Sequence, residues 1–188
     1  MYINNGGNIY EYTPETDTWV RLHIQTPIED FGVVSLNGKL TLVGGRQGLI
    51  YSRVIKVWDS DSKQWTEPYP PMPMGRSGLG CSSYQHYLII AGGETRERAG
   101  QSTTLVEILD TKTKQWFKAP PMRCDGKTVQ SVVIGQTLYL LLSLHNVLTS
   151  SKSLLSVSLP NLISHTLQGK NRDTSIWEKI PDVPVLVL

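Results

Sequence analysis

The strongest constraint on the fold is a repeat about 50 residues long. Each copy holds two alternating apolar runs, a glycine doublet that ends the second run, a third run, and a tryptophan after a polar turn. The doublets Gly44-Gly45 and Gly92-Gly93 are offset by 48 residues, and Trp65 and Trp116 by 51. A period of this length predicts a repeat architecture with one supersecondary unit in each copy.

The apolar runs are typical of half-buried β-strands. Leu40 and Leu42 alternate with polar or smaller residues, which is the pattern of a strand with one face toward a core. Asn37-Gly38 joins two such runs, and this dipeptide is the strongest short-range signal for a hairpin turn. The sequence therefore predicts an all-β fold of antiparallel units.

The order of these features resembles that of kelch repeats, the four-stranded blades of a β-propeller. In that family the glycine doublet closes the second strand, a tyrosine lies in the third, and a tryptophan opens the fourth. The tyrosine position here holds Tyr12, Trp58 and Leu109, and the tryptophans are Trp19, Trp65, Trp116 and Trp177. The fourth copy departs from the pattern, with Leu142-Ser143 at the doublet. The resemblance covers nearly the whole chain and implies a fold, although one fold hosts unrelated activities.

One kelch-repeat domain is therefore expected, built as a partial β-propeller, an open arc of about three full blades plus half a blade. The predicted segments are a half blade at 1–27, blades at 28–75 and 76–125, a degenerate blade at 126–184 and the start of a strand at 185–188. An insertion at 161–174 is polar and is predicted to be a surface loop. Rings of this family usually have more blades, so we expect a fragment of a larger propeller or a truncated product.

The repeated residues are predicted to be structural. Glycine relieves crowding near the axis of a propeller and adopts backbone conformations that other residues avoid. A tryptophan in an outer strand is large enough to fill the gap between adjacent blades. This set comprises Gly44, Gly45, Gly92, Gly93, Tyr12, Trp19, Trp65, Trp116 and Trp177.

The connecting loops are the predicted binding surface. In a four-stranded antiparallel blade, the loop between the second and third strands shares a face with the crossovers between blades. The cations expected on this face are Arg46, Arg53, Arg76, Arg96, Arg98, Arg123 and Lys127. The resemblance implies that the face holds partner proteins, and arginine forks suit carboxylate or phosphate groups. The alternative is a solvated loop set whose charges pair locally, as in Arg96-Glu97-Arg98.

Catalytic and metal-binding signals are weak. The four histidines, His23, His86, His145 and His165, are far apart in the sequence and form no HxH or HExxH pair. We therefore expect no catalytic residue, metal or cofactor. The resemblance leaves open a fragment of a propeller enzyme, either an oxidoreductase such as a copper radical oxidase or a sugar-acid mutarotase. The oxidases need a converging tyrosine, histidine and cysteine set that the sequence does not present.

Composition and charge limit the other functions. A net charge of +2 is too small to indicate nucleic-acid binding, and Cys81 and Cys124 lack metal-binding spacing, so we expect reduced thiols. No apolar run approaches the ~20 residues of a membrane span. The first residues lack the regions of a signal peptide. These observations predict a cytoplasmic, intracellular location without membrane contact.

The predicted function is non-enzymatic protein–protein interaction through the loop face. The resemblance implies that the partner is a substrate of a cullin ubiquitin ligase or a cytoskeletal protein. The basic loops favour an acidic segment of that partner. A third alternative is an inactive truncation without a partner.

Overall fold

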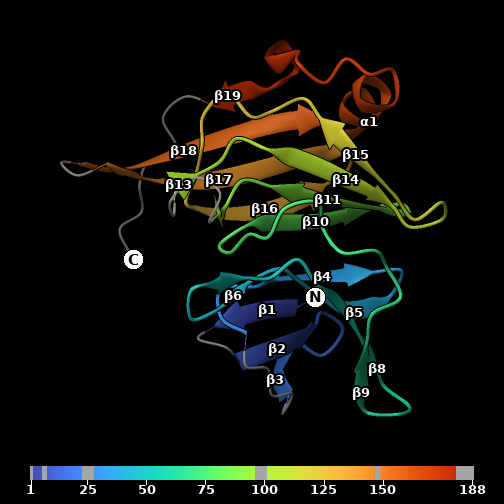
Figure 1. Cartoon of the computed structure of the whole chain (residues 1–188). Helices are drawn as coiled ribbons and strands as arrows, with labels where there is room; N and C mark the ends of the chain where they lie inside the picture. Colours follow the sequence, from blue (N-terminus) through green and yellow to red (C-terminus); the bar gives the residue numbers. More distant parts are fainter. Residues whose placement is uncertain (1, 6–7, 23–27, 96–100, 147–148, 181–188) are drawn as a thin grey trace.

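The computed structural model describes residues 2–5, 8–22, 28–95, 101–146 and 149–180, and nearly all of its regular structure is β-strand (Figure 1). Four sheets follow one another along the chain, and each contains consecutive antiparallel strands. We call them the N-terminal blade, blade 1, blade 2 and blade 3. The prediction of an all-β fold built from four-stranded antiparallel blades is confirmed.

The strands of each blade run outward from the first to the last. The N-terminal blade contains β1 (Tyr2–Asn5), β2 (Asn8–Thr13) and β3 (Thr18–Leu22), and blade 1 contains β4 (Gly32–Leu36), β5 (Lys39–Val43), β8 (Ile55–Asp59) and β9 (Gln64–Thr66). Blade 2 contains β10 (Gly80–Tyr84), β11 (Tyr87–Ala91), β14 (Val106–Asp110) and β15 (Gln115–Ala119). Blade 3 contains β16 (Thr128–Ile134), β17 (Thr137–Asn146), β18 (Thr149–Ser158) and β19 (Glu178–Ile180).

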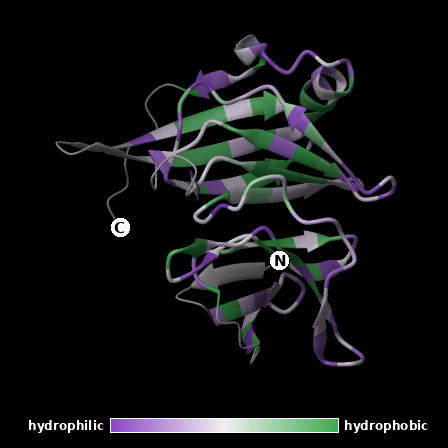
Figure 2. Ribbon diagram, viewed as in Figure 1, coloured by the Kyte–Doolittle hydropathy of each residue, from purple (hydrophilic) through white to green (hydrophobic). Residues whose placement is uncertain are grey.

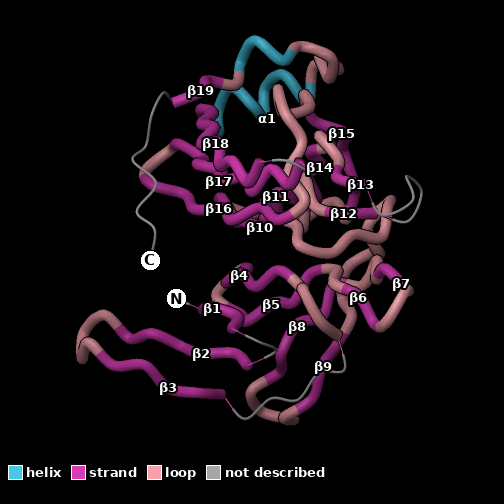
Figure 3. Tube along the Cα trace, turned by 90° about the vertical axis from the view of Figure 1, so that its left-hand side faces the viewer, coloured by secondary structure: helices cyan, strands magenta, loops and turns pink. Residues whose placement is uncertain are grey.

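The blades form an open arc. The first strands β4, β10 and β16 lie side by side, with β1 next to β4, so the sheets fan out from a common inner edge. Figures 1 and 3 show the N-terminal blade and blade 3 at opposite ends of the described chain. The ends of the arc therefore do not meet within the part of the chain that the structure describes.

Two of the predicted segments differ from the structure. The N-terminal blade was expected to be a half blade of two strands, but Tyr2–Asn5 forms a third strand that pairs with β2. The insertion at 161–174 was expected to be a loop. Instead its first half, 161–167, belongs to helix α1 (Leu159–Leu167), and a 3-10 turn, η2 (Thr174–Ile176), begins at its end. Leu159 and Leu162 of this helix are buried, which stabilises helical structure within an insertion that is polar on average.

The hydrophobic core lies between the blades. Three buried clusters fill the three gaps between consecutive sheets, and Figure 2 shows the apolar residues concentrated on the strands and the hydrophilic ones in the turns. Successive side chains along a strand point to opposite faces of the sheet, so one strand contributes apolar residues to the clusters on both sides. In blade 2, Ile89 belongs to the cluster with blade 3, and its neighbours Leu88 and Ile90 belong to the cluster with blade 1. Each inner blade is therefore buried on both sides.

The inner strands are also joined by hydrogen bonds between blades. The Gly78 backbone N–H donates to the Asp30 carbonyl at 2.9 Å, and the Val129 N–H donates to the Gly78 carbonyl at 2.8 Å. The Ser131 hydroxyl donates to the Cys81 carbonyl at 2.9 Å, which is a second hydrogen bond between the first strands of blades 2 and 3. These bonds fix neighbouring blades relative to one another near the common inner edge.

The tryptophans occupy unequal environments. Trp177 is completely buried and its indole Nε1 donates to the Pro120 carbonyl at 3.2 Å. Trp116 is half-buried and donates to the Pro70 carbonyl at 3.4 Å, so both side chains reach back to the preceding crossover. Trp65 packs edge-on against Trp58 with ring centroids 5.1 Å apart. Trp19 contacts Tyr12 at 4.8 Å but is 49% exposed, because no described blade lies beyond it.

The glycine doublets lie where blades approach most closely. All four glycines have a positive φ, which only glycine adopts readily. The second glycine of each doublet links two blades, since the Gly45 N–H donates to the Arg76 carbonyl at 2.8 Å and the Gly93 N–H donates to the Gly126 carbonyl at 3.0 Å. A Cβ atom on Gly93 would lie only 2.6 Å from the Ser77 carbonyl oxygen.

Replacing Gly93 with alanine should therefore destabilise the fold strongly. We expect a loss in unfolding free energy above the about 1–2 kcal/mol that a positive φ alone costs an L-residue, because the new methyl group meets a backbone oxygen. Gly48→Ala is the matched control, since Gly48 also has a positive φ but nothing lies near its Cβ position. Urea unfolding of both variants measures the difference. Equal losses would show that the close approach has no energetic role.

Candidate functional site

One face of the arc collects the loops between the second and third strands. In blade 1 this loop forms a small hairpin of β6 (Arg46–Gln47) and β7 (Ile50–Tyr51), and in blade 2 it contains β12 (Glu94–Thr95) and β13 (Gln101–Ser102). Isolated bridges tie the two loops to the crossovers that enter the blades, through the pairs Glu29 and Arg46, and Ser77 and Glu94. We call this surface the loop face, and its composition from loops and crossovers agrees with the prediction.

A pocket of about 450 Å³ opens on the loop face near the common inner edge. It lies where β4, β10 and β16 begin, so three blades contribute to its wall. Its charged lining residues are Asp30, Arg46, Glu94 and Lys127, and the remaining lining residues are the polar Ser77, Thr128 and Gln130 with Phe31, Gly78, Leu79 and Val129. The pocket thus combines a polar mouth with residues from segments far apart in the sequence.

The charges at this pocket are already paired. Arg46 Nε donates to Asp30 Oδ2 at 2.8 Å, and Lys127 Nζ lies 3.5 Å from Glu94 Oε2. The hydrogen bond and the charge of Asp30 raise the pKa of the Arg46 guanidinium. Burial, together with the nearby Glu94 carboxylate, raises the pKa of the Tyr51 phenol above its usual value. With two cations balanced by two anions, the mouth carries no excess positive charge.

Arg76 was predicted to bind a partner, and this prediction is wrong. Its side chain is completely buried between blades 1 and 2. Arg76 Nη2 donates to Glu107 Oε2 at 2.5 Å, and Nη1 donates to the carbonyls of Gly92 and Leu105 at 3.3 and 3.2 Å. Burial lowers the pKa of Arg76 and raises the pKa of Glu107, while their mutual attraction opposes both changes. Arg76 therefore joins blade 2 to the crossover that precedes it.

Arg46 and Lys127 both line the pocket, but the predicted cations Arg53 and Arg123 do not. Arg53 Nε donates to the Met72 carbonyl at 2.5 Å. Arg123 donates to the carbonyls of Thr174 and Ser175 at 3.2 and 3.3 Å. Each of these exposed side chains thus holds a neighbouring segment of the same chain. Arg96 and Arg98 lie outside the described residues, so their part of the prediction stays a prediction.

The tip of the β6–β7 hairpin carries two exposed apolar side chains that the sequence reading missed. Leu49 is 84% exposed and Ile50 is 68% exposed, the largest values among the exposed large hydrophobic residues that the structure describes. Ile50 is the first residue of β7. The signal in the sequence was Gly48, whose positive φ makes the turn that projects these side chains from the loop face.

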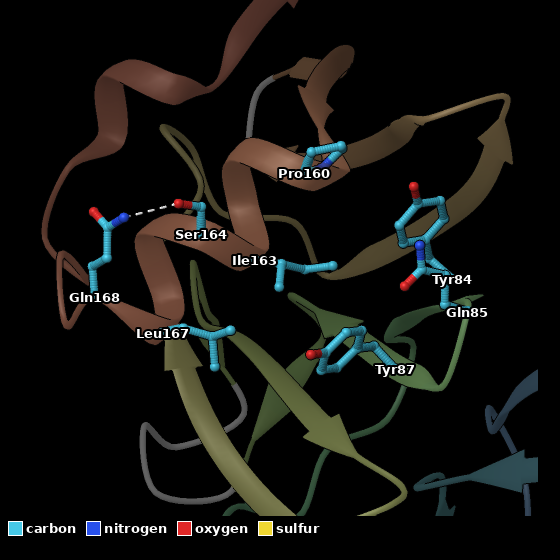
Figure 4. A pocket seen from close by; sticks show the side chains of 8 residues that line it. All are labelled: Tyr84, Gln85, Tyr87, Pro160, Ile163, Ser164, Leu167 and Gln168. Carbon is cyan, nitrogen blue, oxygen red and sulfur yellow. Dashed lines mark hydrogen bonds between the residues drawn. The ribbon is translucent and has the colours of Figure 1, made fainter.

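A second hollow, a groove of about 480 Å³, lies at the opposite ends of the strands from the loop face (Figure 4). The turn between β10 and β11 contributes Tyr84 and Tyr87, and α1 contributes Ile163 and Leu167. Gln168 Nε2 donates to Ser164 Oγ at 3.0 Å along the helix. The lining holds no carboxylate, histidine, lysine or arginine side chain, and its titratable groups are the phenols of Tyr84 and Tyr87.

Titratable groups elsewhere are dispersed. His86 Nε2 lies 3.7 Å from Asp110 Oδ1, and His165 Nδ1 lies 3.6 Å from Asp173 Oδ2, at separate places in the fold. Within the described residues, no three histidine, cysteine, aspartate or glutamate side chains are grouped to hold a metal ion. Both cysteines are free thiols, as predicted, and burial raises the pKa of Cys81 to about 12.

Among the residues that the structure describes, no helix has the length and apolar character to cross a membrane.

Comparison with known proteins identifies the repeat. Two family models, both described as the kelch motif, match residues 30–71 and 75–123, which correspond to blades 1 and 2. Kelch-like protein 35 of Mus musculus is 24% identical over 136 residues, covering 72% of this chain and 23% of that protein. The influenza virus NS1A-binding protein homolog of Mus musculus is 37% identical over 73 residues, covering 39% of this chain and 11% of that protein.

The fold has counterparts among solved structures. The structure of YjhT matches with a TM-score of 0.60 and 16% identity, over 78% of this chain and 57% of that one. At this identity the similarity shows the fold alone. The chain spans about a quarter and about a tenth of the two curated relatives that it matches.

Proposed function

The chain belongs to the kelch-repeat family of β-propellers, and on this premise we propose that it binds a partner polypeptide through the loop face. The observation that carries the proposal is the β6–β7 hairpin, whose tip exposes Leu49 and Ile50 and whose Arg46 lines the polar pocket. When a partner covers exposed aliphatic side chains, apolar surface leaves water, and this burial stabilises the complex. One of the relatives is named for binding a protein, which supports the same class of function.

The arrangement suits a peptide that has an apolar side chain as an anchor and, near it, hydrogen-bond donors and acceptors. The anchor would pack on Leu49 and Ile50. The pocket on the same loop face, which Arg46 of this hairpin lines, offers the paired charges of Arg46 with Asp30 and Lys127 with Glu94. Paired charges at a rim select orientation more than they add affinity. We therefore revise the expected partner from an acidic segment to an apolar segment flanked by polar residues.

Replacing Leu49 and Ile50 with aspartate should weaken binding by about tenfold or more, because an interface would then bury unpaired carboxylates. The ligand is a peptide selected on the wild-type chain from a random library displayed on phage, and its dissociation constant is measured by fluorescence anisotropy. Leu167→Asp is the control, since Leu167 is 55% exposed but lies on α1, away from the loop face. Equal affinity for the hairpin variant and the control would contradict the proposal.

A second candidate function rests on the pocket itself. A cavity of about 450 Å³ with carboxylates and cations at its mouth is large enough for a sugar acid, which is the ligand class of the propeller mutarotases. Thermal-shift measurements with a panel of sugar acids distinguish the two functions. A shift that Arg46→Ala removes would favour the enzyme alternative. Recognition of a cullin-ligase substrate or a cytoskeletal protein, and an intracellular location, stay predictions.

A further inference from the structure

The groove of about 480 Å³ between the β10–β11 turn and α1 has two walls of different chemistry. One wall belongs to blade 2, and the other is the helix in the segment that connects β18 to β19 of blade 3. The groove lies at the opposite ends of the strands from the loop face (Figure 4). A ligand held there would contact two neighbouring blades without touching the loop face.

The helical wall is aliphatic. Leu159 and Leu162 of α1 are buried in the cluster between blades 2 and 3. Pro160, Ile163 and Leu167 follow one another at spacings of three and four residues, so they form a second apolar stripe along the helix. This stripe lines the groove, and Leu167 is 55% exposed. The described chain therefore leaves aliphatic surface on this wall in contact with water.

The facing wall is aromatic and polar. Tyr84 ends β10 and Tyr87 begins β11, and both rings pack against the cluster between blades 2 and 3. The Tyr87 ring also packs against His86, with ring centroids 4.1 Å apart. Figure 4 shows the Gln85 amide beside the Tyr84 ring, across the groove from α1. These contacts hold the two rings in place before any ligand binds, which lowers the entropic cost of binding.

The polar groups of this wall are available as hydrogen-bond donors. Within the described part of the chain, the Tyr84 hydroxyl, the Gln85 amide and the Tyr87 hydroxyl make no hydrogen bond to another residue, and they reach solvent. Burial, together with the nearby Asp110 carboxylate, raises the pKa of the Tyr87 phenol. The phenol therefore stays protonated at neutral pH and can donate a hydrogen bond.

The charge and polarity of the walls define the ligand. No lining side chain carries a charge at neutral pH, so the part of the ligand that enters the groove is uncharged. The ligand needs apolar surface on two sides, because one wall is aliphatic and the other is aromatic. It also needs hydrogen-bond acceptors that face the turn. A saccharide meets the second need but would bury hydroxyl groups against Ile163 and Leu167, which offer them no hydrogen bond.

We propose that this groove binds a proline-rich segment of a partner protein in the polyproline II conformation. Such a segment has apolar pyrrolidine rings around its axis, no N–H at its prolines, and carbonyl groups without internal hydrogen bonds. Its rings pack between the tyrosines and the aliphatic stripe of α1, and its carbonyls accept hydrogen bonds from Gln85 and the phenols. Aromatic-lined grooves are a recurring means of recognising this conformation. The inference is independent of partner binding at the loop face.

Fluorescence anisotropy of fluorescein-labelled decaproline tests the groove in the 188-residue chain. We expect saturable binding of decaproline and none of a Gly-Ser peptide of equal length. Leu167→Asp should raise the dissociation constant about tenfold or more, because the complex would bury a carboxylate against an apolar ligand. Leu49→Asp is the matched control, since it places the same charge on an exposed leucine of the loop face. Absence of saturable binding, or equal losses in the two variants, would overturn the proposal.

Gln85→Glu tests the direction of the hydrogen bonds. The two side chains have nearly the same shape, but glutamate replaces the amide donor with acceptors that repel the proline carbonyls. We expect decaproline to bind about fivefold more weakly or worse, while circular dichroism shows the variant folded. Unchanged affinity would overturn the assignment of acceptors to the ligand. Displacement of decaproline by maltopentaose from both the wild-type chain and this variant would identify a saccharide site instead.

The peptide selected for the loop face separates this proposal from the proposed function. Leu167→Asp should leave the affinity of that peptide unchanged, and Leu49→Asp should weaken it. Decaproline should show the opposite pattern. Loss of decaproline binding in Leu49→Asp alone would place the proline-rich ligand on the loop face and overturn the groove as its site.

Discussion

Replacing Arg76 with methionine should lower the free energy of unfolding by about 3–5 kcal/mol, the usual cost of removing one partner of a buried ion pair. The reason is that Glu107 would remain, almost fully buried between blades 1 and 2, without its cation. The carbonyl of Gly92 would also lose the hydrogen bond that Arg76 donates. Urea unfolding followed by tryptophan fluorescence measures the loss.

The matched control removes both charges. Arg76→Met combined with Glu107→Leu should recover more than half of the stability that the single variant loses, since a well-packed apolar pair often replaces a buried ion pair without cost. The same loss in the single and double variants would show that the ion pair is not the cause. If Arg76→Met abolished peptide binding without lowering the free energy of unfolding, the original prediction that Arg76 contacts a partner would be supported instead.

Replacing Trp177 with alanine should cost about 3–5 kcal/mol, the range for deleting a buried large aromatic side chain. Trp177 is completely buried in the cluster between blades 2 and 3, and its indole holds the Pro120 carbonyl. The variant therefore loses both the packing between the two blades and the bond to the crossover. Thermal unfolding followed by circular dichroism measures the effect.

The other tryptophans provide graded controls for this prediction. The loss should decrease from Trp177 to the half-buried Trp116 and then to Trp19, which is half exposed. Trp177→Phe should recover part of the loss, since a phenyl ring fills much of the space but donates no hydrogen bond. A loss at Trp19 equal to that at Trp177 would contradict the interpretation.

Most of the fold could be predicted because its signals are local and repeated. The Asn37-Gly38 turn forms as expected, with positive φ angles of 51° and 76° that join β4 to β5. The glycine doublets and the tryptophans recur at nearly the same spacing, so the strands assigned in one copy support those assigned in the next copy. The third strand of the N-terminal blade was missed, because only a few residues precede the recognisable motif.

The helix at 159–167 was missed for a different reason. It begins just before the insertion at 161–174, which is polar on average because of residues 168–174, and a loop was the natural prediction for a polar insertion between two strands. Only three of its residues, Leu159, Leu162 and Thr166, are buried. A narrow apolar stripe of this kind becomes a signal only when the sheet that it covers is known.

The binding face was the least predictable feature. The sequence shows that arginines cluster in the loops, but it does not show which of them reach solvent. Arg53 and Arg123 hold neighbouring carbonyls, and Arg46 holds Asp30. The exposed pair Leu49 and Ile50 was not predicted to be part of the binding surface, because apolar residues are more often buried than exposed.

The amino-acid sequence by itself determined the strands, their turns and the stacking of similar sheets. These depend on periodicity and on residues such as Gly93, whose positive φ few residues other than glycine adopt. Only the tertiary structure decided which side chains are available to a partner. Arg76 and Glu107 are 31 residues apart in the chain and meet in the gap between two blades. Exposure and charge pairing depend on how the blades pack together, and no local pattern in the sequence carries that information.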